Sequence, residues 1–253
     1  KYKIKYLIIF VLIFTSCAYF SSYGRSFKRA KSYASKGDYD NATNEAITSL
    51  LENRNYVPSI ELIELVFPKA IKLHHKSINR FMESQDYYKW DLIVLELNDL
   101  ISLVDNLESL DMDQTEIWLF QAETRDYYSE LLESKTNAAE AHYQKGLEYM
   151  NLGDRENLRL AATEFKLISL KFVNNYKDSY NLYIQCRESS AIKLAILPFE
   201  NKSGKNKYGS IGNTISNEII TKLFDNQDSM EFLDIINRDQ IDLIINEQKL
   251  SHS

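Results

Sequence analysis

Apolar residues recur at steps of three and four positions through most of the chain, from about Ser26 to Arg187. This spacing predicts a succession of amphipathic helices, each of which needs partner helices to cover its apolar stripe. Helix-breaking residues are scarce, since the 253 residues include seven glycines and three prolines. One predicted helix runs from Asp91 to Leu110, with its apolar stripe at Leu92, Leu95, Leu100, Leu103, Val104 and Leu107.

The pattern changes near residue 192. The apolar run 192–199 predicts a buried strand, followed by a polar loop. A helix is predicted over 211–224, a second strand over 231–236, and a last helix after its N-cap residue Asn237. We therefore expect an α+β chain in which an all-α helical array precedes a β-α-β-α segment.

The helical region contains an internal repeat. The segment from Ala42 to Ser59 recurs from Ala162 to Ser179, at an offset of 120 residues (42 to 162), with the same Ala-Thr, Ser-Leu and Asn-Tyr pairs. A Gly-Asp pair precedes each copy, as Gly37-Asp38 and Gly153-Asp154, and predicts a turn between two helices. In these turns the glycines would take a positive φ that costs another residue about 1 kcal/mol or more.

The two alanines that open the repeated segments are expected where facing helices approach closely. A leucine in place of Ala162 would then overpack the contact and lower stability by about 1–3 kcal/mol. Ala42 is expected to occupy the same position in the first copy.

This order of elements resembles a tetratricopeptide repeat: a helix, a Gly-Asp turn, a second helix, and an Asn-Tyr pair that opens another helix. The first unit, near Ser26 to Leu51, follows the family pattern at Ala30, Tyr33, Gly37, Tyr39, Ala42 and Ala46. The resemblance implies a stack of helix pairs whose groove binds another protein. The middle, from Phe81 to Ser134, lacks the Gly-Asp turn, so a mixed helical bundle and a simple spacer remain alternatives.

The N-terminus has the layout of a secretory signal peptide. Lysines at 1, 3 and 5 precede an apolar run over 7–14 that is short for a membrane span, and Thr15-Ser16-Cys17 follows. The site resembles the lipobox of bacterial lipoproteins, which implies that residues 1–16 are removed and that Cys17 carries the covalent lipid. An uncleaved anchor, or ordinary cleavage beside an incidental cysteine, is the alternative. No Asp follows Cys17, which by resemblance to lipoprotein sorting signals implies the periplasmic face of the outer membrane.

The C-terminal strings IKLAILPFENKSG, ISNEIITKLF and INRDQIDLIINEQKLS resemble the opening of CsgG-type curli-secretion lipoproteins, of LpoB-type activators of cell-wall synthases, and of the N-terminal domain of TolB. The implied domains are a lipidated linker over 17–25, helical repeats over 26–190, and the first part of a CsgG-like domain over 191–253. The chain has no initiator Met and stops where that family continues, so we expect it to be truncated at both ends.

The resemblance implies an outer-membrane component of a secretion or envelope-assembly complex, with other envelope proteins as partners of the repeats. The CsgG-like segment would contribute a homo-oligomer around a channel. The alternative is a regulator or scaffold that docks on an envelope machine without forming a channel. A net charge of −6 argues against nucleic acid as a partner.

Candidate chemistry is sparse. His74 and His75 are adjacent on a predicted helix and point to different faces, while His142 and His252 have no companions, so structural or surface roles are expected for all four. We expect no enzyme activity, no metal site and no cofactor besides the lipid on Cys17. Cys186 is expected to be a buried small hydrophobe. Six aromatic residues could form either core or an interaction surface: Tyr87, Tyr88, Trp90, Trp118, Tyr127 and Tyr128.

Overall fold

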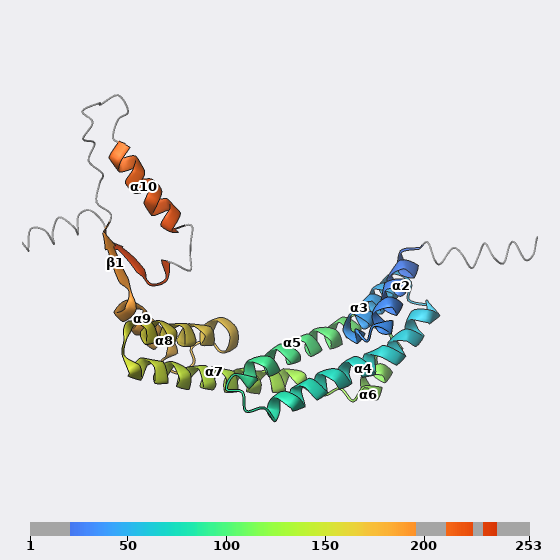
Figure 1. The fold of residues 1–253 in the computed structure, drawn as a ribbon. Helices are drawn as coiled ribbons and strands as arrows, with labels where there is room; N and C mark the ends of the chain where they lie inside the picture. The colour runs from blue at the N-terminus through green and yellow to red at the C-terminus, as the bar shows by residue number, and fades with distance from the viewer. Residues whose placement is uncertain (1–20, 196–210, 225–229, 237–253) are drawn as a thin grey trace, which may run out of the picture. The chain divides into compact units, whose positions relative to one another are not determined.

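The computed structural model describes residues 21–195, 211–224 and 230–236, and these are mostly helical (Figure 1). The helical region that the periodicity predicts is confirmed. The chain divides into two compact units, residues 1–138 and 139–253.

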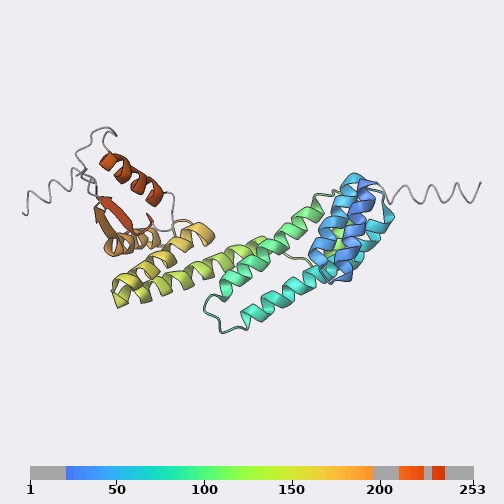
Figure 2. The ribbon, with the colours of Figure 1, turned by 45° about the horizontal axis from the view of Figure 1, so that its top comes forward.

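The first unit is built from helices that pack side by side. Figure 2 shows α2 and α3 next to α4, and α5 runs along α4. The helices of this unit are α2 (Ser22–Ser35), α3 (Tyr39–Glu52), α4 (Val57–Met82), α5 (Lys89–Glu108), α6 (Asp113–Gln121) and the first part of α7 (Tyr127–Leu152).

Local sequence signals explain where these helices begin. Ser21 is the N-cap of α2, where its hydroxyl oxygen accepts a hydrogen bond from the Gly24 amide at 3.1 Å. Asp38 caps α3 in the same way, by accepting from the Asn41 amide at 3.2 Å. Pro58 lies in the first turn of α4, where its missing N–H costs no helical hydrogen bond.

One hydrophobic core fills the first unit. Its largest fully buried side chains include Leu50, Ile63, Phe67, Leu97 and Trp118, and small alanines at 30, 42, 46 and 70 let the helices approach. The core face of α5 agrees with the predicted stripe at Leu100, Leu103 and Leu107, which are buried, and differs near the start of the helix. Leu92 and Leu95 are exposed, at 36% and 60%, because the helix turns residues 93, 94, 97 and 101 toward the core instead.

The second unit continues α7 and adds a helical hairpin and a small sheet. Its core joins Ala139 of α7 to Ala161, Ala162 and Phe165 of α8 and to Cys186 of α9. Cys186 is fully buried, as the sequence predicts. The elements are α8 (Arg155–Leu167), the π-helix η1 (Ile168–Phe172), α9 (Ser179–Ser190), β1 (Ile192–Ala195), α10 (Ile211–Phe224) and β2 (Leu233–Ile236).

Strands β1 and β2 pair in parallel, with Ile192 opposite Leu233 and Ala195 opposite Ile236. A parallel pair needs a crossover connection, and α10 lies between the strands in sequence, so the predicted β-α-β order is confirmed over the described residues. The bounds of α10 agree with the predicted helix, and β2 lies within the predicted strand.

The sheet is attached to the helices of its own unit. Phe232, just before β2, packs against the core around Phe165 and lies 5.3 Å from the Arg159 guanidinium. Arg187 on α9 donates to the Glu231 carbonyl at 2.9 Å and to the Asp234 carboxylate at 3.0 Å.

Several predictions fall outside the described residues. These are the signal segment with Cys17, the end of the first strand, the polar loop after it, the last helix and His252. Among the residues that are described, no helix is both long enough and apolar enough to cross a bilayer.

Candidate functional site

The predicted Gly-Asp turns are present in both units. Gly37 has φ +79° and Gly153 has φ +76°, the left-handed conformation expected from the sequence. After each glycine an aspartate caps the next helix: Asp38 accepts from the Asn41 amide, and Asp154 accepts from the Asn157 amide at 3.0 Å. The two helical hairpins therefore close with the same local chemistry.

Small residues lie at the helix contacts of both hairpins. Ala42 and Ala162 have no exposed surface, as the sequence predicts. Ala30 on α2 is also fully buried, and Gly146 on α7 lies the same seven residues before its turn glycine. A Cβ atom at Gly146 would lie 2.6 Å from the Phe165 ring, so only glycine fits this contact.

An aromatic contact links the same parts of each hairpin. The rings of Phe27 and Tyr56 meet edge to face with centroids 5.4 Å apart. In the second unit, Tyr143 and Tyr176 meet edge to face at 6.1 Å. Phe27 precedes its turn glycine by as many residues as Tyr143 does, and Tyr56 and Tyr176 belong to the repeated Asn-Tyr pairs.

The register of the repeat changes inside the second hairpin. The buried positions 42, 43, 46 and 49 of the first copy correspond to buried positions 161, 162, 165 and 168, an offset of 119 (42 to 161). At the Asn-Tyr pair the offset is 120. The π-helix η1 lies between these points and accommodates one extra residue; the offset at the turn glycines is 116 (37 to 153), so the other three extra residues of the second copy precede η1. Inside α8, the buried positions therefore lie one residue earlier than the sequence match predicts.

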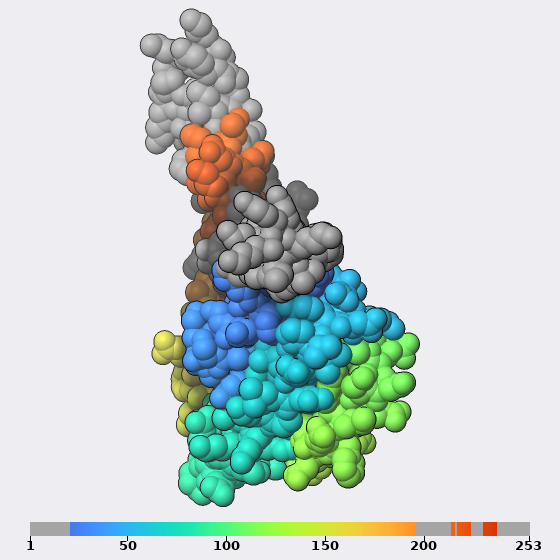
Figure 3. Space-filling view, turned by 90° about the vertical axis from the view of Figure 1, so that its right-hand side faces the viewer, coloured from blue at the N-terminus to red at the C-terminus, as the bar shows by residue number. Residues whose placement is uncertain are grey.

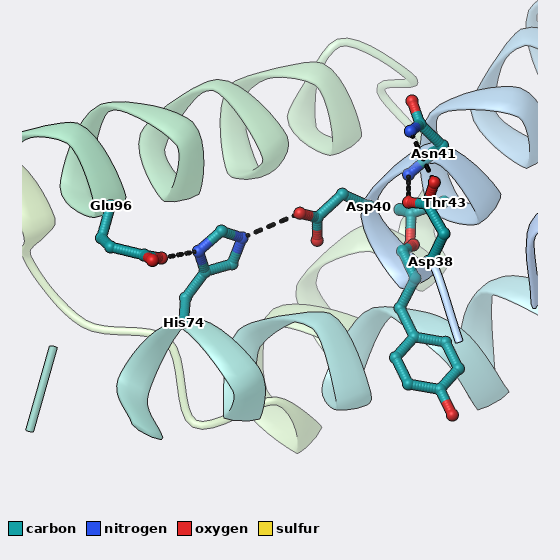
Figure 4. Close-up of polar contacts among 7 residues, drawn as sticks. Asp38, Asp40, Asn41, Thr43, His74 and Glu96 are labelled. Carbon is teal, nitrogen blue, oxygen red and sulfur yellow. Dashed lines mark hydrogen bonds and ion pairs between the residues drawn. The ribbon is translucent and has the colours of Figure 1, made fainter. Parts of the chain in front are cut away.

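A buried histidine joins three helices next to the first turn (Figure 4). His74 on α4 places Nδ1 2.7 Å from Oε2 of Glu96 on α5 and Nε2 3.2 Å from Oδ2 of Asp40 on α3. Burial by itself would lower the pKa of His74, but the hydrogen bonds to Asp40 and Glu96 outweigh burial and raise the pKa to about 9.

A cavity of about 290 Å³ opens beside His74. The turn and α3 contribute Gly37, Asp38, Tyr39 and Asp40 to its lining, α4 contributes Leu73, His74 and Ser77, and α5 contributes Glu96. The ring nitrogens of His74 both face carboxylates, so at neutral pH the imidazolium has no lone pair with which to accept a proton or bind a metal ion. The arrangement is suited to holding α3, α4 and α5 together.

The second unit has a matching pair. His142 on α7 places Nδ1 2.5 Å from Oε2 of Glu164 on α8, and its ring stacks on Phe172 with centroids 5.1 Å apart. In both units the glutamate follows its histidine by 22 residues. Neither pair is apparent from the sequence. A buried histidine needs a polar partner, but the sequence does not show which carboxylate on the next helix supplies it.

The other predicted candidates do not converge on one site. His75 contacts Tyr127, with Nε2 2.9 Å from the phenol oxygen, so the two adjacent histidines face different neighbours as helical geometry predicts. The aromatic group is divided: Trp118 and Tyr127 belong to the core, while Tyr87 and Tyr128 are exposed. Within the described residues, no group of three His, Cys, Asp or Glu side chains could hold a metal ion.

Comparisons of the chain with protein-family models, with curated proteins and with solved structures gave no match. Local geometry and sequence motifs are therefore the basis on which a function is assigned.

Proposed function

We propose that this protein is a lipid-anchored component of the bacterial outer membrane whose helical repeats bind another envelope protein, within a secretion or assembly complex resembling curli transport. The observation that carries the proposal is the repeated hairpin: a glycine turn, an aspartate cap, close small-residue packing and an edge-to-face aromatic pair occur in both units. Helix pairs of this kind expose long side surfaces that suit protein binding.

Exposed apolar side chains support a binding role. Leu51 at the end of α3 is 56% exposed, Leu95 on α5 is 60% exposed, and Leu170 in η1 is 66% exposed. Leu51 lies in the last turn of the second helix of the first hairpin, and Leu170 lies directly after the second helix of the other. Apolar side chains in such positions gain free energy when a partner covers them.

The membrane and secretion parts of the proposal rest on the sequence. The basic and apolar start that ends at Cys17 supports lipid attachment, and two or more acyl chains would hold the protein at a membrane. The β1-α10-β2 segment has the order that the resemblance to CsgG-type lipoproteins implies.

Two measurements test the anchor. Metabolic labelling with a radioactive fatty acid should mark the wild type and fail in Cys17→Ala. Label retained by that variant would reject the lipoprotein assignment. Protease added to intact cells should leave the helices uncut if they face the periplasm, so their digestion would reject that location.

Photo-crosslinking tests the binding role. Leu51, Leu95 and Leu170 would be replaced one at a time by photo-reactive p-benzoyl-phenylalanine, in cells that carry the full-length protein. We expect a discrete adduct with an envelope protein from at least one position after irradiation, and none in samples kept in the dark. Absence of an adduct at all three exposed positions would contradict protein binding by the helical units.

A further inference from the structure

The short helix α6 turns its apolar residues toward solvent. Phe120 is 86% exposed and Ile117 is 54% exposed. The two residues are three apart, so they share one helix face. In Figure 3 the segment that contains α6, in bright green, forms a flank of the face in view.

The opposite face of α6 fixes the helix to the first unit. Trp118 and Thr115 are buried against this unit, and Ala122 follows them at the C-cap. The outward face is therefore held in place before any partner arrives, which lowers the entropy cost of binding. The apolar area of Phe120 is left open by the described residues, and covering it would gain free energy.

Acidic residues accompany the apolar pair. Asp113 and Glu116 lie one helical turn before Ile117 and Phe120, and all four side chains are exposed. The surrounding segment 111–135 contains seven acidic and two basic residues. One of the basic residues, Arg125, is bonded to Glu130. This surface combines apolar contact area with strong negative charge.

The charge decides between the occupants. A second copy of this chain carries a net charge of −6 and would bring the same acidic segment against itself. An anionic lipid surface would likewise repel Asp113 and Glu116. A segment with apolar residues on one face and Lys or Arg beside them would cover Phe120 and pair with the carboxylates.

We propose that the outward face of α6, formed by Asp113, Glu116, Ile117 and Phe120, is a docking site for a basic amphipathic helix of a partner protein. This inference rests on the proposed protein-binding function and names the surface and the chemistry of the partner. The apolar pair supplies affinity, and the two carboxylates select the positively charged partner.

Two synthetic helical peptides of about 18 residues test the proposal on the full-length protein. One peptide has leucines on one face and lysines on the other, and the second has glutamates in place of the lysines. Fluorescence anisotropy should show binding of the lysine peptide alone. Phe120→Ser should weaken that binding by about tenfold or more, while Leu160→Ser on α8, which is 46% exposed, should change it by less than about twofold.

A charge reversal provides the sharper measurement. Asp113→Lys combined with Glu116→Lys should abolish binding of the lysine peptide and create binding of the glutamate peptide. Circular dichroism checks that these exposed substitutions leave the helices intact. Equal loss in the Leu160→Ser control, or no exchange of peptide preference in the reversed variant, would overturn the proposal.

The competing occupants give different results. Self-association that is lost in Phe120→Ser would identify a second copy of the chain as the occupant. Binding to vesicles of anionic phospholipid that depends on Phe120 would identify a membrane as the occupant. Either result would overturn the proposal. Failure of both peptides while positions 51, 95 or 170 still crosslink a protein would reject this docking site and leave the proposed function standing.

Discussion

Gly146 shows how one absent methyl group sets the approach of two helices. Its missing Cβ leaves room for the Phe165 ring, which is 1% exposed and packed on all sides within the second core. We expect Gly146→Ala to lower the free energy of unfolding by about 1–3 kcal/mol, because the buried ring cannot move away without disturbing its neighbours. Chemical denaturation monitored by circular dichroism measures this change.

A second substitution separates the clash from other effects. Phe165→Leu removes the ring, so the double variant Gly146→Ala with Phe165→Leu should lose less stability than the two single changes added together. Additive losses would show that the methyl group and the ring do not meet.

His74 should make stability depend on pH in the alkaline range. Its pKa is about 9 in the folded protein because Asp40 and Glu96 hold the proton, against about 6.5 in an unfolded chain. The folded state therefore binds the proton more tightly, and the resulting stability is complete below pH 6.5 and is lost as pH rises through 9. Relative to His74→Gln, the wild type should lose on the order of 2 kcal/mol between these values.

The neighbouring His75 is the matched control. Burial and the nearby Arg125 charge lower the pKa of His75, so its contribution is lost on acidification and not at alkaline pH. Denaturation curves between pH 5 and about 10 should show this contrast. The stability advantage of the wild type over His74→Gln should shrink as pH rises, whereas its stability relative to His75→Gln should fall as pH is lowered. The same alkaline dependence in both variants would contradict the role of Asp40 and Glu96.

At the scale of elements, local chemistry was readable from the sequence and packing register was not. Gly37 and Gly153 could be assigned to turns because few residues accept a positive φ. The helix 211–224 could be bounded from its periodicity. The buried face of α5 was predicted only at Leu100, Leu103 and Leu107, because leucines occur on both faces near the start of the helix and only the neighbouring helices decide which are covered.

The repeated Ala-Thr pair was misleading in the same way. Thr43 is buried and Thr163 is exposed, although both occupy the same place in the sequence repeat. The extra residue that the π-helix η1 takes up separates the sequence match from the burial match. A one-residue insertion in a helix is visible in backbone hydrogen bonds and leaves no signature in composition.

This interpretation of η1 predicts the effect of a deletion. Removal of the exposed residue Lys171 should convert the π turn to an α turn and change the free energy of unfolding by less than about 1 kcal/mol. Removal of the exposed Thr48 from α3, which has no such turn, should rotate the residues after it out of the core and cost more than about 2 kcal/mol. Thermal melts of both deletions provide the comparison, and equal costs would show that η1 is not an inserted residue.

At the scale of the whole molecule, the described residues contain two separate hydrophobic cores. The first is centred on α3, α4 and α5 and includes Phe67, while the second joins the end of α7 to α8 and α9 and includes Phe165. The boundary between the two units falls inside α7, near residue 138, so a continuous helix belongs to both. Periodicity predicts which helices have an apolar stripe to bury. It does not show that these helices pack into two cores, since the stripes of both groups have the same sequence pattern.

Two cores lead us to expect two unfolding transitions. Phe67→Ala should lower only the transition of the first unit, and Phe165→Ala only that of the second, each by about 3–5 kcal/mol, because each ring contacts residues of its own core. Urea titrations followed through the tryptophans report the first unit, since Trp90 and Trp118 both pack in its core. Far-ultraviolet circular dichroism reports both units together. If both substitutions shifted one shared transition by the same amount, α7 would couple the cores into a single cooperative unit, and the helical region would unfold as one body.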